Sequence, residues 1–490
     1  MLLACRRNVG AAPLSSWLAE HLIPESPFSM RPLFILPSVV LISSCVLGPD
    51  PASPGVKIPT NFRNDTAPHG PSFGDKSWRS VFSDAVLRNL IARALANNPD
   101  LVASSYRIEE AQALAGAARA SGIPTLDGDA AASTDYRSRN AGQGSSAAAR
   151  HSQSYNLTGI AAWELDLWGG IARGNQAARA RLLEAEYQRD AVQTSLIATV
   201  ASSYIDLQNL DERLAISRRT AASRKGSLEL VTARRDGGVS ADLEVGQAEA
   251  LLSQAEILIP ATERSISEKE NEIRALLGEF PGNIRRGGSL EKLATSLRIT
   301  AGLPSSLMAR RPDISAADQA FQAATADIGV AEALRFPTLS LTGQGGLVSG
   351  DLNKLLQAGS AAYSIGPQLT GPLFDAGRAG FRVKAAQARA KIALTDYQKS
   401  VRLAFQETAN ALTAYQKSGE IIAQGSRLVA SQKSVSGIAL DRFQGGASSY
   451  LEVLDAERGL FTAELDLADA RSNRLRAVVQ AYRALGGGWK

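Results

Sequence analysis

Cysteine and histidine are both scarce in this chain of 490 residues. Cys5 and Cys45 are its only cysteines, and His21, His69 and His151 are its only histidines. Two cysteines are too few for a scaffold held by disulfides or for a zinc site built from thiolates. Three scattered histidines also argue against a histidine metal centre or an enzyme that uses histidine for acid–base catalysis.

A phosphate-binding loop is lacking as well. The glycine-rich stretch Gly343–Gly346 lies inside a strand pattern and lacks the following helix and acidic residue of a dinucleotide-binding loop. With so few histidines, no Ser-His-Asp set can be nominated. We therefore expect no enzymatic activity, no cofactor and no metal.

An excess of charge and a large aromatic content are missing too. The formal net charge is +5, from 53 basic and 48 acidic residues, and aromatic residues make up 6% of the chain. This mild balance gives no reason to expect nucleic acid as a partner. Alanine, leucine, glutamine, glutamate and arginine are abundant instead, which favours long helices over compact α/β domains.

No apolar run is long enough to cross a bilayer as a helix, which takes about 20 residues. The strongest run, Leu33–Ile42, follows the short basic segment Met30-Arg31 and leads into Ser43-Ser44-Cys45. This order is typical of a lipoprotein signal, in which the leader is removed and the cysteine carries the lipid. The alternative is a buried strand before an ordinary cysteine.

The lipoprotein interpretation predicts a signal peptide over residues 1–44 and lipidation of Cys45. Met30 is the more natural start, so residues 1–29 would lie upstream of it. Val46 follows the cysteine where an aspartate would indicate retention in the inner membrane, so the outer membrane is favoured. Prolines then recur at Pro49, Pro51, Pro54 and Pro59. Because proline at this density prevents helix and sheet, residues 45–75 are predicted to be an extended linker.

The rest of the chain is an internal duplication. The sequence RRDGGVSADLEVGQAEA begins at Arg234, and the related RFQGGASSYLEVLDAER begins 208 residues later at Arg442. Asn98-Pro99-Asp100 and Arg311-Pro312-Asp313 each open a helix that runs into a proline-led strand. We predict a first repeat over 76–278, an insertion over 279–305 around the middle of the helices, and a second repeat over 306–490.

Four segments alternate between apolar and polar residues with the period of a strand. They cover residues about 125–137, 154–166, 338–348 and 362–370. In the first, Leu126, Ala130 and Tyr136 oppose Asp127 and Asp129. Each is long enough to cross a bilayer when tilted. The alternative is a soluble antiparallel sheet with one solvated face.

Four strands are too few to close a barrel, and unpaired strand edges are not tolerated in lipid. Membrane strands of this number would therefore require several copies of the chain to share one barrel.

Very long helices separate the strand pairs. The stretches Ala172–Arg235 and Ala376–Gln444 contain no proline, and each ends at a Gly-Gly pair that stops a helix. A second helix returns at once, which predicts antiparallel helical hairpins with tips at about 237–241 and 445–449. Pro260 and Pro281-Gly282 are expected to interrupt the returning helix of the first repeat.

These features together resemble the TolC-type outer membrane efflux protein family, in its lipoprotein (NodT-like) branch. The resemblance covers nearly all of the chain after the leader. It is carried by motifs that occur in the family's order: Cys45 with Gly48-Pro49-Asp50, Trp163–Gly169, Arg310–Ile314, Phe336-Pro337 and Ala484–Trp489. The resemblance implies a mainly α protein with transmembrane β-strands. In it, three chains each give four strands to one twelve-stranded outer-membrane barrel, and the hairpins form an α-barrel tunnel.

The resemblance also implies a function. The trimer would be the passive exit duct of a tripartite efflux system, anchored by lipid in the outer membrane and extending far into the periplasm. Its partners would be a periplasmic adaptor (membrane fusion) protein and an inner-membrane pump, expected to be of the RND type. The competing hypothesis is a lipid-anchored periplasmic coiled-coil scaffold without a pore, which explains the helices but not four two-faced strands.

By resemblance, the gate of the tunnel lies just after the second tip. Leu451 would form a hydrophobic constriction, Glu452 and Asp455 would form acidic rings, and Arg458 would pair with Asp455 or a neighbouring chain. Spacings of four and three place Leu451, Asp455 and Arg458 on one helix face. The alternative is an ordinary solvated helix face.

Two further expectations concern the tips. Some family members carry an arginine at the position of Ser448 that helps to lock the closed mouth, whereas this chain has a serine there. Glu244, the first-repeat counterpart of Glu452, is a candidate gate partner. The residues expected to dock on the adaptor are Gly237, Gly238, Val239, Gly445, Gly446 and Ala447.

Overall fold

The structure, a computed structural model, describes residues 46–63, 71–136, 138, 151–288 and 299–489. The predicted signal peptide, Cys45 and His69 lie outside these described residues. All of these described residues belong to one compact unit. None of the helices in the described part of the chain is both long and apolar enough to span a membrane.

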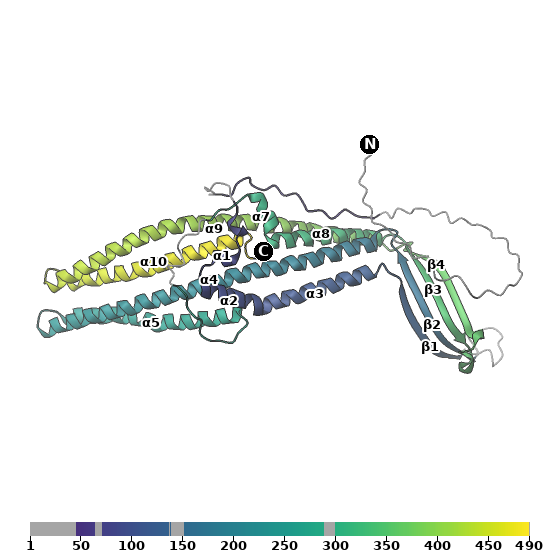
Figure 1. The fold of residues 1–490 in the computed structure, drawn as a ribbon, viewed down its shortest axis with the longest axis horizontal. Helices are drawn as coiled ribbons and strands as arrows, with labels where there is room; N and C mark the ends of the chain where they lie inside the picture. Colours follow the sequence, from purple (N-terminus) through teal and green to yellow (C-terminus); the bar gives the residue numbers. More distant parts are fainter. Residues whose placement is uncertain (1–45, 64–70, 137, 139–150, 289–298, 490) are drawn as a thin grey trace, which may run out of the picture. The chain divides into compact units, whose positions relative to one another are not determined.

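Two helical hairpins of equal dimensions dominate the fold (Figure 1). The first joins α4 (Gly170–Asp236) to α5 (Asp242–Leu276), and the second joins α9 (Arg378–Gln444) to α10 (Tyr450–Ala484). In each hairpin the outgoing helix has 67 residues and the returning helix has 35. Two further helices of 22 residues each, α3 (Pro99–Ala120) and α8 (Pro312–Ala333), lead into the strand pairs. This equality confirms the predicted tandem duplication.

The expected interruption at Pro260 is wrong, because α5 runs unbroken through it. A proline inside a helix removes one backbone donor, which leaves the carbonyl group four residues earlier without its partner. Here Pro260 and Glu256, the residue that bears this carbonyl, are both exposed. Water can therefore replace the lost hydrogen bond, and the helix continues to Leu276.

The four strands form one antiparallel sheet in the order β1 (Thr125–Tyr136), β2 (His151–Leu165), β3 (Thr338–Ser349) and β4 (Ala361–Thr370). The strand pairs have registers that align Thr125 with Ala162, Leu165 with Leu339, and Thr338 with Thr370. β1 and β4 are the two edges, and each has one side unpaired among the described residues.

The register gives the sheet one polar and one apolar face. On the polar face Asp129 lies opposite Thr158, and its carboxylate accepts a hydrogen bond of 2.5 Å from the Asn156 side chain. On the apolar face Leu126 and Tyr363 are 80% and 90% exposed. A single chain therefore leaves a face of leucine and aromatic side chains uncovered, as a lipid-facing sheet does.

The two repeats end their hairpins with the same kind of contact. The Asn98 side chain donates to the carbonyl of Leu276 (2.9 Å), and Arg311 Nη1 donates to the carbonyl of Ala484 (3.4 Å). These carbonyl groups are at the ends of α5 and α10. The Asn-Pro-Asp and Arg-Pro-Asp motifs therefore tie the start of one helix to the end of another. Arg311 in addition forms two hydrogen bonds to Asp313, at 2.9 and 2.6 Å.

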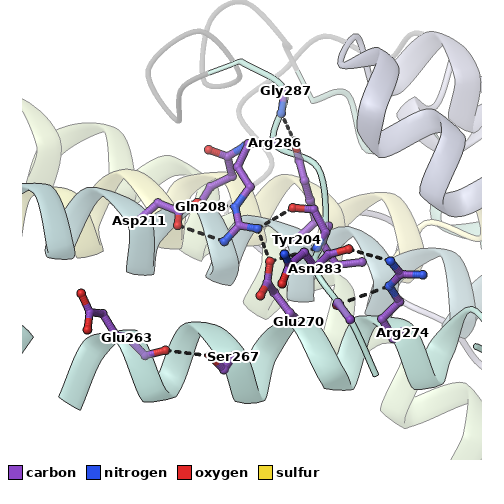
Figure 2. Close-up of polar contacts among 12 residues, drawn as sticks. Tyr204, Gln208, Asp211, Glu263, Ser267, Glu270, Arg274, Asn283, Arg286 and Gly287 are labelled. Carbon is purple, nitrogen blue, oxygen red and sulfur yellow. Dashed lines mark hydrogen bonds and ion pairs between the residues drawn. The ribbon is translucent and has the colours of Figure 1, made fainter. Parts of the chain in front are cut away.

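The segment that links the repeats is fixed to the first hairpin (Figure 2). Arg286 donates from Nε and Nη2 to the two oxygens of Asp211 on α4, and it also pairs with Glu270 on α5. The Tyr204 hydroxyl accepts from the backbone of Gly287 at 2.7 Å. The pKa of Arg286 is raised, chiefly by its hydrogen bonds to Asp211. Residues 284–287 are thus held where α4 and α5 run side by side.

The first described residues are held by a buried arginine. Arg173, near the start of α4, is 2% exposed and donates to the carbonyls of Leu47 and Gly48, each at 2.9 Å. Its guanidinium also pairs with Asp50 at 2.9 Å. The chain that follows Cys45 is therefore attached where the sheet meets the helices.

The remaining helices of the described residues are short, except for α2. They are η1 (Phe73–Asp75), α1 (Trp78–Val81), α2 (Ala85–Asn97), α7 (Pro304–Arg310), η3 (Leu352–Lys354) and η4 (Ala358–Ser360). Several of them contribute to the main apolar core, which also takes in the middle of α4 and the end of α10. The core therefore lies where α5 and α10 end, beside the middle of α4 and α9.

Candidate functional site

The two hairpin tips have the same backbone geometry. At the first, the Val239 amide donates to the Arg234 carbonyl and the Gly238 amide to the Arg235 carbonyl, both at 2.8 Å. Ala447 and Gly446 repeat this pattern at the second tip. Gly238 and Gly446 have φ of 76° and 74°, a left-handed conformation that explains the Gly-Gly pairs. Each turn reverses the chain within a few residues.

All six residues predicted to dock on an adaptor are exposed at these tips: Gly237, Gly238, Val239, Gly445, Gly446 and Ala447. Val239 is 68% exposed and Leu243, at the start of α5, is 71% exposed. The tips therefore present small residues and isolated apolar side chains, with backbone that is held by its own hydrogen bonds.

The predicted gate residues share one exposed face of α10. Leu451, Glu452, Asp455 and Arg458 are all exposed, and Leu451 is 62% exposed. The opposite face is buried in a small core at the tips, to which it gives Tyr450, Val453, Leu454 and Ala456. The helix therefore directs Glu452, Asp455 and Arg458 away from the core that joins the two tips.

Glu452 and Asp455 line an open groove between α10 and α9. On α9 this groove includes Val435 and Ile438, which are 51% and 56% exposed, together with Arg442. A groove with carboxylates on one side and exposed apolar residues on the other is suited to contact with another chain or to lining a water-filled passage.

The ion pairs expected around the gate do not form within one chain. Among the described residues, neither Arg458 nor Glu244 takes part in an ion pair with Asp455 or with any other side chain. Glu244 is half-buried and contributes to the raised pKa of the Tyr450 hydroxyl, which burial raises to about 12. A partner for Arg458 would have to come from another subunit.

The structure adds a buried ion pair that the sequence did not indicate. Arg224 on α4 is 2% exposed and Glu457 on α10 is 9% exposed, and Arg224 Nε lies 3.9 Å from Glu457 Oε2. Arg224 Nη1 donates to the Leu251 carbonyl at 2.7 Å, and Ser227 donates to Glu457 at 2.9 Å. The Arg224 guanidinium also lies 5.0 Å from the ring centre of Phe461. This cluster joins the first hairpin to the second.

The cluster is incompletely satisfied. Neither Arg224 Nε nor Glu457 Oε2 has a hydrogen-bond partner. Burial raises the pKa of Glu457 and lowers that of Arg224, which means that in both residues it opposes the charged form. The one signal in the sequence is that Glu457 follows Val453 by four residues and so lies on the apolar face of its helix.

No described group of three or more histidine, cysteine or acidic residues could hold a metal ion.

Comparison with known proteins gives a consistent result. The family model described as "Outer membrane efflux protein" matches residues 90–279 and 303–487. The toluene efflux pump outer membrane protein TtgI of Pseudomonas putida is 33% identical over 476 residues, which are 94% of this chain and 98% of that protein. The cation efflux system protein CusC of Escherichia coli K12 is 31% identical over 468 residues, 94% of this chain and 100% of that protein.

The fold is shared with solved channels. The outer-membrane channel OprN superposes with a TM-score of 0.84 at 31% identity, covering 91% of this chain and 100% of that chain. The open state of the MtrE outer membrane channel of Neisseria gonorrhoeae has a TM-score of 0.81 at 30% identity, covering 91% and 99%.

Proposed function

The chain belongs to the outer membrane efflux protein family, and on this basis we propose that it is the exit duct of a tripartite efflux system. The observation that carries the proposal is the sheet, which has one apolar face, one polar face and two unpaired edges. Long helices extend from that sheet to tips with exposed acidic side chains. The expected fold class, efflux function, partners and outer-membrane location are those of the family.

Three copies would complete the duct. Unpaired strand edges are not tolerated in lipid, so β4 of one copy must pair with β1 of the next. The helices also have two outer edges. α3, α4, α8 and α9 pack side by side in this order, so α3 and α9 lie on the outside. The outermost two carry exposed apolar side chains: Val102, Tyr106 and Leu114 on α3, and Phe381, Ile392 and Leu403 on α9. Three chains would give twelve strands, enough to close a membrane barrel.

The partners follow from the relatives' names. TtgI is named as part of an efflux pump and CusC as part of a cation efflux system. For this chain, an adaptor would dock on the six tip residues, and an inner-membrane pump of the RND type would supply the energy. The gate would be formed by Leu451, Glu452, Asp455 and Arg458, with Glu244 as its neighbour on α5.

Cys45 would add a lipid anchor. It immediately precedes the segment that Arg173 holds at the junction of sheet and helices. More than one acyl chain on this residue would give stable attachment to the membrane. The duct has no enzymatic role in this proposal, since its contribution is a passage and not a reaction.

Purified protein in detergent is expected to migrate as a trimer in SDS without heating and as a monomer after boiling. Reconstituted in planar bilayers, the trimer should give discrete conductance steps, because a closed barrel with a polar interior conducts ions. A heat-denatured sample is the control. The alternative of a lipid-anchored scaffold without a pore predicts no conductance, and a monomer or a silent trimer would overturn the duct.

A further inference from the structure

A pocket between α8 and α9 has no role in the duct as described above. The two helices lie side by side (Figure 1), and the pocket between them is open and has a volume of about 460 Å³. α9 contributes two arginines to it, Arg382 and Arg389. The rest of the lining is apolar apart from one carboxylate, and consists of Asp327, Val330, Ala331, Leu334, Ala385 and Ala386. The pocket therefore combines two cations with an apolar surface.

The two arginines have no counter-charge in their own chain. Arg382 and Arg389 are both exposed and are seven residues apart, so they lie on one face of α9, about 10.5 Å apart along its axis. Among the described residues, neither takes part in an ion pair or a side-chain hydrogen bond. The one carboxylate of the pocket, Asp327, pairs instead with Arg181 on α4. The pocket therefore keeps two positive charges for a ligand.

The internal duplication shows that these charges are a property of the second repeat. α9 begins 208 residues after α4, so Arg389 corresponds to Arg181, and Arg382 corresponds to Gly174. The first repeat thus has one arginine in this place, and Asp327 pairs with it. The second repeat has two, and neither has an acidic partner among the described residues.

The pocket opens on the side of the polar face of the sheet. Val330 and Leu334 line it, and they also line a second pocket together with Glu164 at the end of β2. Glu164 lies opposite Ser340, on the same face of the sheet as Thr158, because alternate residues of a strand share a face. In the duct proposed above this polar face lines the passage, so a compound in the passage would reach the pocket between α8 and α9.

We propose that this pocket binds an anionic amphiphile, with its acidic head group on Arg382 and Arg389 and its apolar part on the aliphatic lining. Guanidinium groups form charge-assisted hydrogen bonds to carboxylate, sulfonate and phosphate groups. Val330, Leu334 and the alanines of α9 remove apolar surface of the ligand from water. The proposal rests on the duct proposed above and deepens it, because it names a class of compound that the passage would bind. A cationic amphiphile would be repelled, and a neutral one would gain the apolar contact alone.

Fluorescence titration of the full chain in lipid nanodiscs tests the pocket. The probe is anilinonaphthalene sulfonate, and N-phenylnaphthylamine, which has the same rings without the sulfonate, is the neutral comparison. After subtraction of empty nanodiscs, the sulfonate should bind saturably. Arg382→Gln combined with Arg389→Gln should weaken this binding at least tenfold and leave binding of the neutral compound within about twofold. Equal binding of both compounds to the parent, or sulfonate binding unchanged in the arginine variant, would overturn the site.

A matched control removes the same charge elsewhere on the same helix. Lys384 and Lys391 are exposed and also seven residues apart, but each follows an arginine of the pocket by two residues and so points about 200° away around α9. Lys384→Gln combined with Lys391→Gln should change sulfonate binding by less than twofold. A loss as large as that of the arginine variant would assign the effect to net charge and overturn the site.

A carboxylate placed between the arginines gives an independent test. Ala385 lies three residues after Arg382 and four before Arg389, so the new side chain of Ala385→Glu could pair with both. This variant should weaken sulfonate binding about as strongly as the arginine variant, and Ala385→Gln should weaken it several-fold less. Equal effects of the two substitutions would overturn the role of charge.

Conductance of the same preparations separates this site from the duct. A conducting trimer whose sulfonate binding does not depend on Arg382 and Arg389 would overturn the pocket and leave the duct standing. Arginine-dependent binding to a protein that gives no conductance would support the pocket and overturn the duct.

Discussion

Replacing Glu452 by Gln and Asp455 by Asn should reduce the preference of the channel for cations several-fold. In a threefold assembly the two positions give two successive rings of three carboxylates, about 4.5 Å apart along the helix, and rings of like charge set the ion selectivity of a pore. Both side chains are exposed on the face of α10 that turns away from the tip core, so their removal leaves that core intact. The measurement is the reversal potential of the reconstituted channel in a salt gradient.

A matched control is Glu249→Gln. Glu249 is an exposed carboxylate on α5 near the first tip, and it is the first-repeat counterpart of Glu457. The Glu249→Gln variant should have the same reversal potential as the parent channel. If the double variant keeps the cation preference of the parent, Glu452 and Asp455 do not line the pore, and the charged face of α10 is an ordinary solvated surface.

Neutralising Glu457 should loosen the attachment of the two hairpins near their tips. Glu457→Gln keeps an acceptor for Ser227 but leaves the buried guanidinium of Arg224 without a counter-charge. Removing one partner of a buried pair costs about 3–5 kcal/mol. Amide hydrogen exchange in the tip halves of α4 and α10 should therefore become at least about 100-fold faster, since 1.4 kcal/mol corresponds to a factor of ten.

Two comparisons make this test specific. Glu263→Gln removes one partner of the exposed Arg218–Glu263 pair, which joins α4 to α5 with both side chains about half-exposed. It should change the exchange by less than a factor of about five, since such pairs contribute up to about 1 kcal/mol. Arg224→Met combined with Glu457→Leu should recover most of the protection, because burial opposes both charges. Equal effects of Glu457→Gln and Glu263→Gln would show that the buried pair carries no special energy.

The helices and strands were largely predictable because their signals are local. Alternation with period two located the strands, and proline-free stretches ended by Gly-Gly pairs located α4 and α9. The failure at Pro260 has a local cause that the sequence does not show. Whether a proline breaks a helix depends on what surrounds the carbonyl group that loses its donor, and here the residue that bears this carbonyl, Glu256, is exposed.

The tips were predictable in part. The spacing of Leu451, Asp455 and Arg458 places them on one helix face, and the structure exposes that face. Their roles in a gate came only from family resemblance and remain a proposal. The Arg224–Glu457 pair could not be found from spacing, because its partners lie in different repeats and meet only when the hairpins pack.

The sequence by itself determined the duplication, the alternating strands and the hairpin turns, since each depends on residues close together in the chain. The tertiary structure decided which segments meet: Arg173 with the first described residues, Arg286 with Asp211, and Arg224 with Glu457. It also placed β2 of the first repeat beside β3 of the second, which joins the two strand pairs into one sheet. The physical reason is that helix and strand periods are fixed by backbone geometry, whereas long-range partners are selected by packing and burial, which no local pattern encodes.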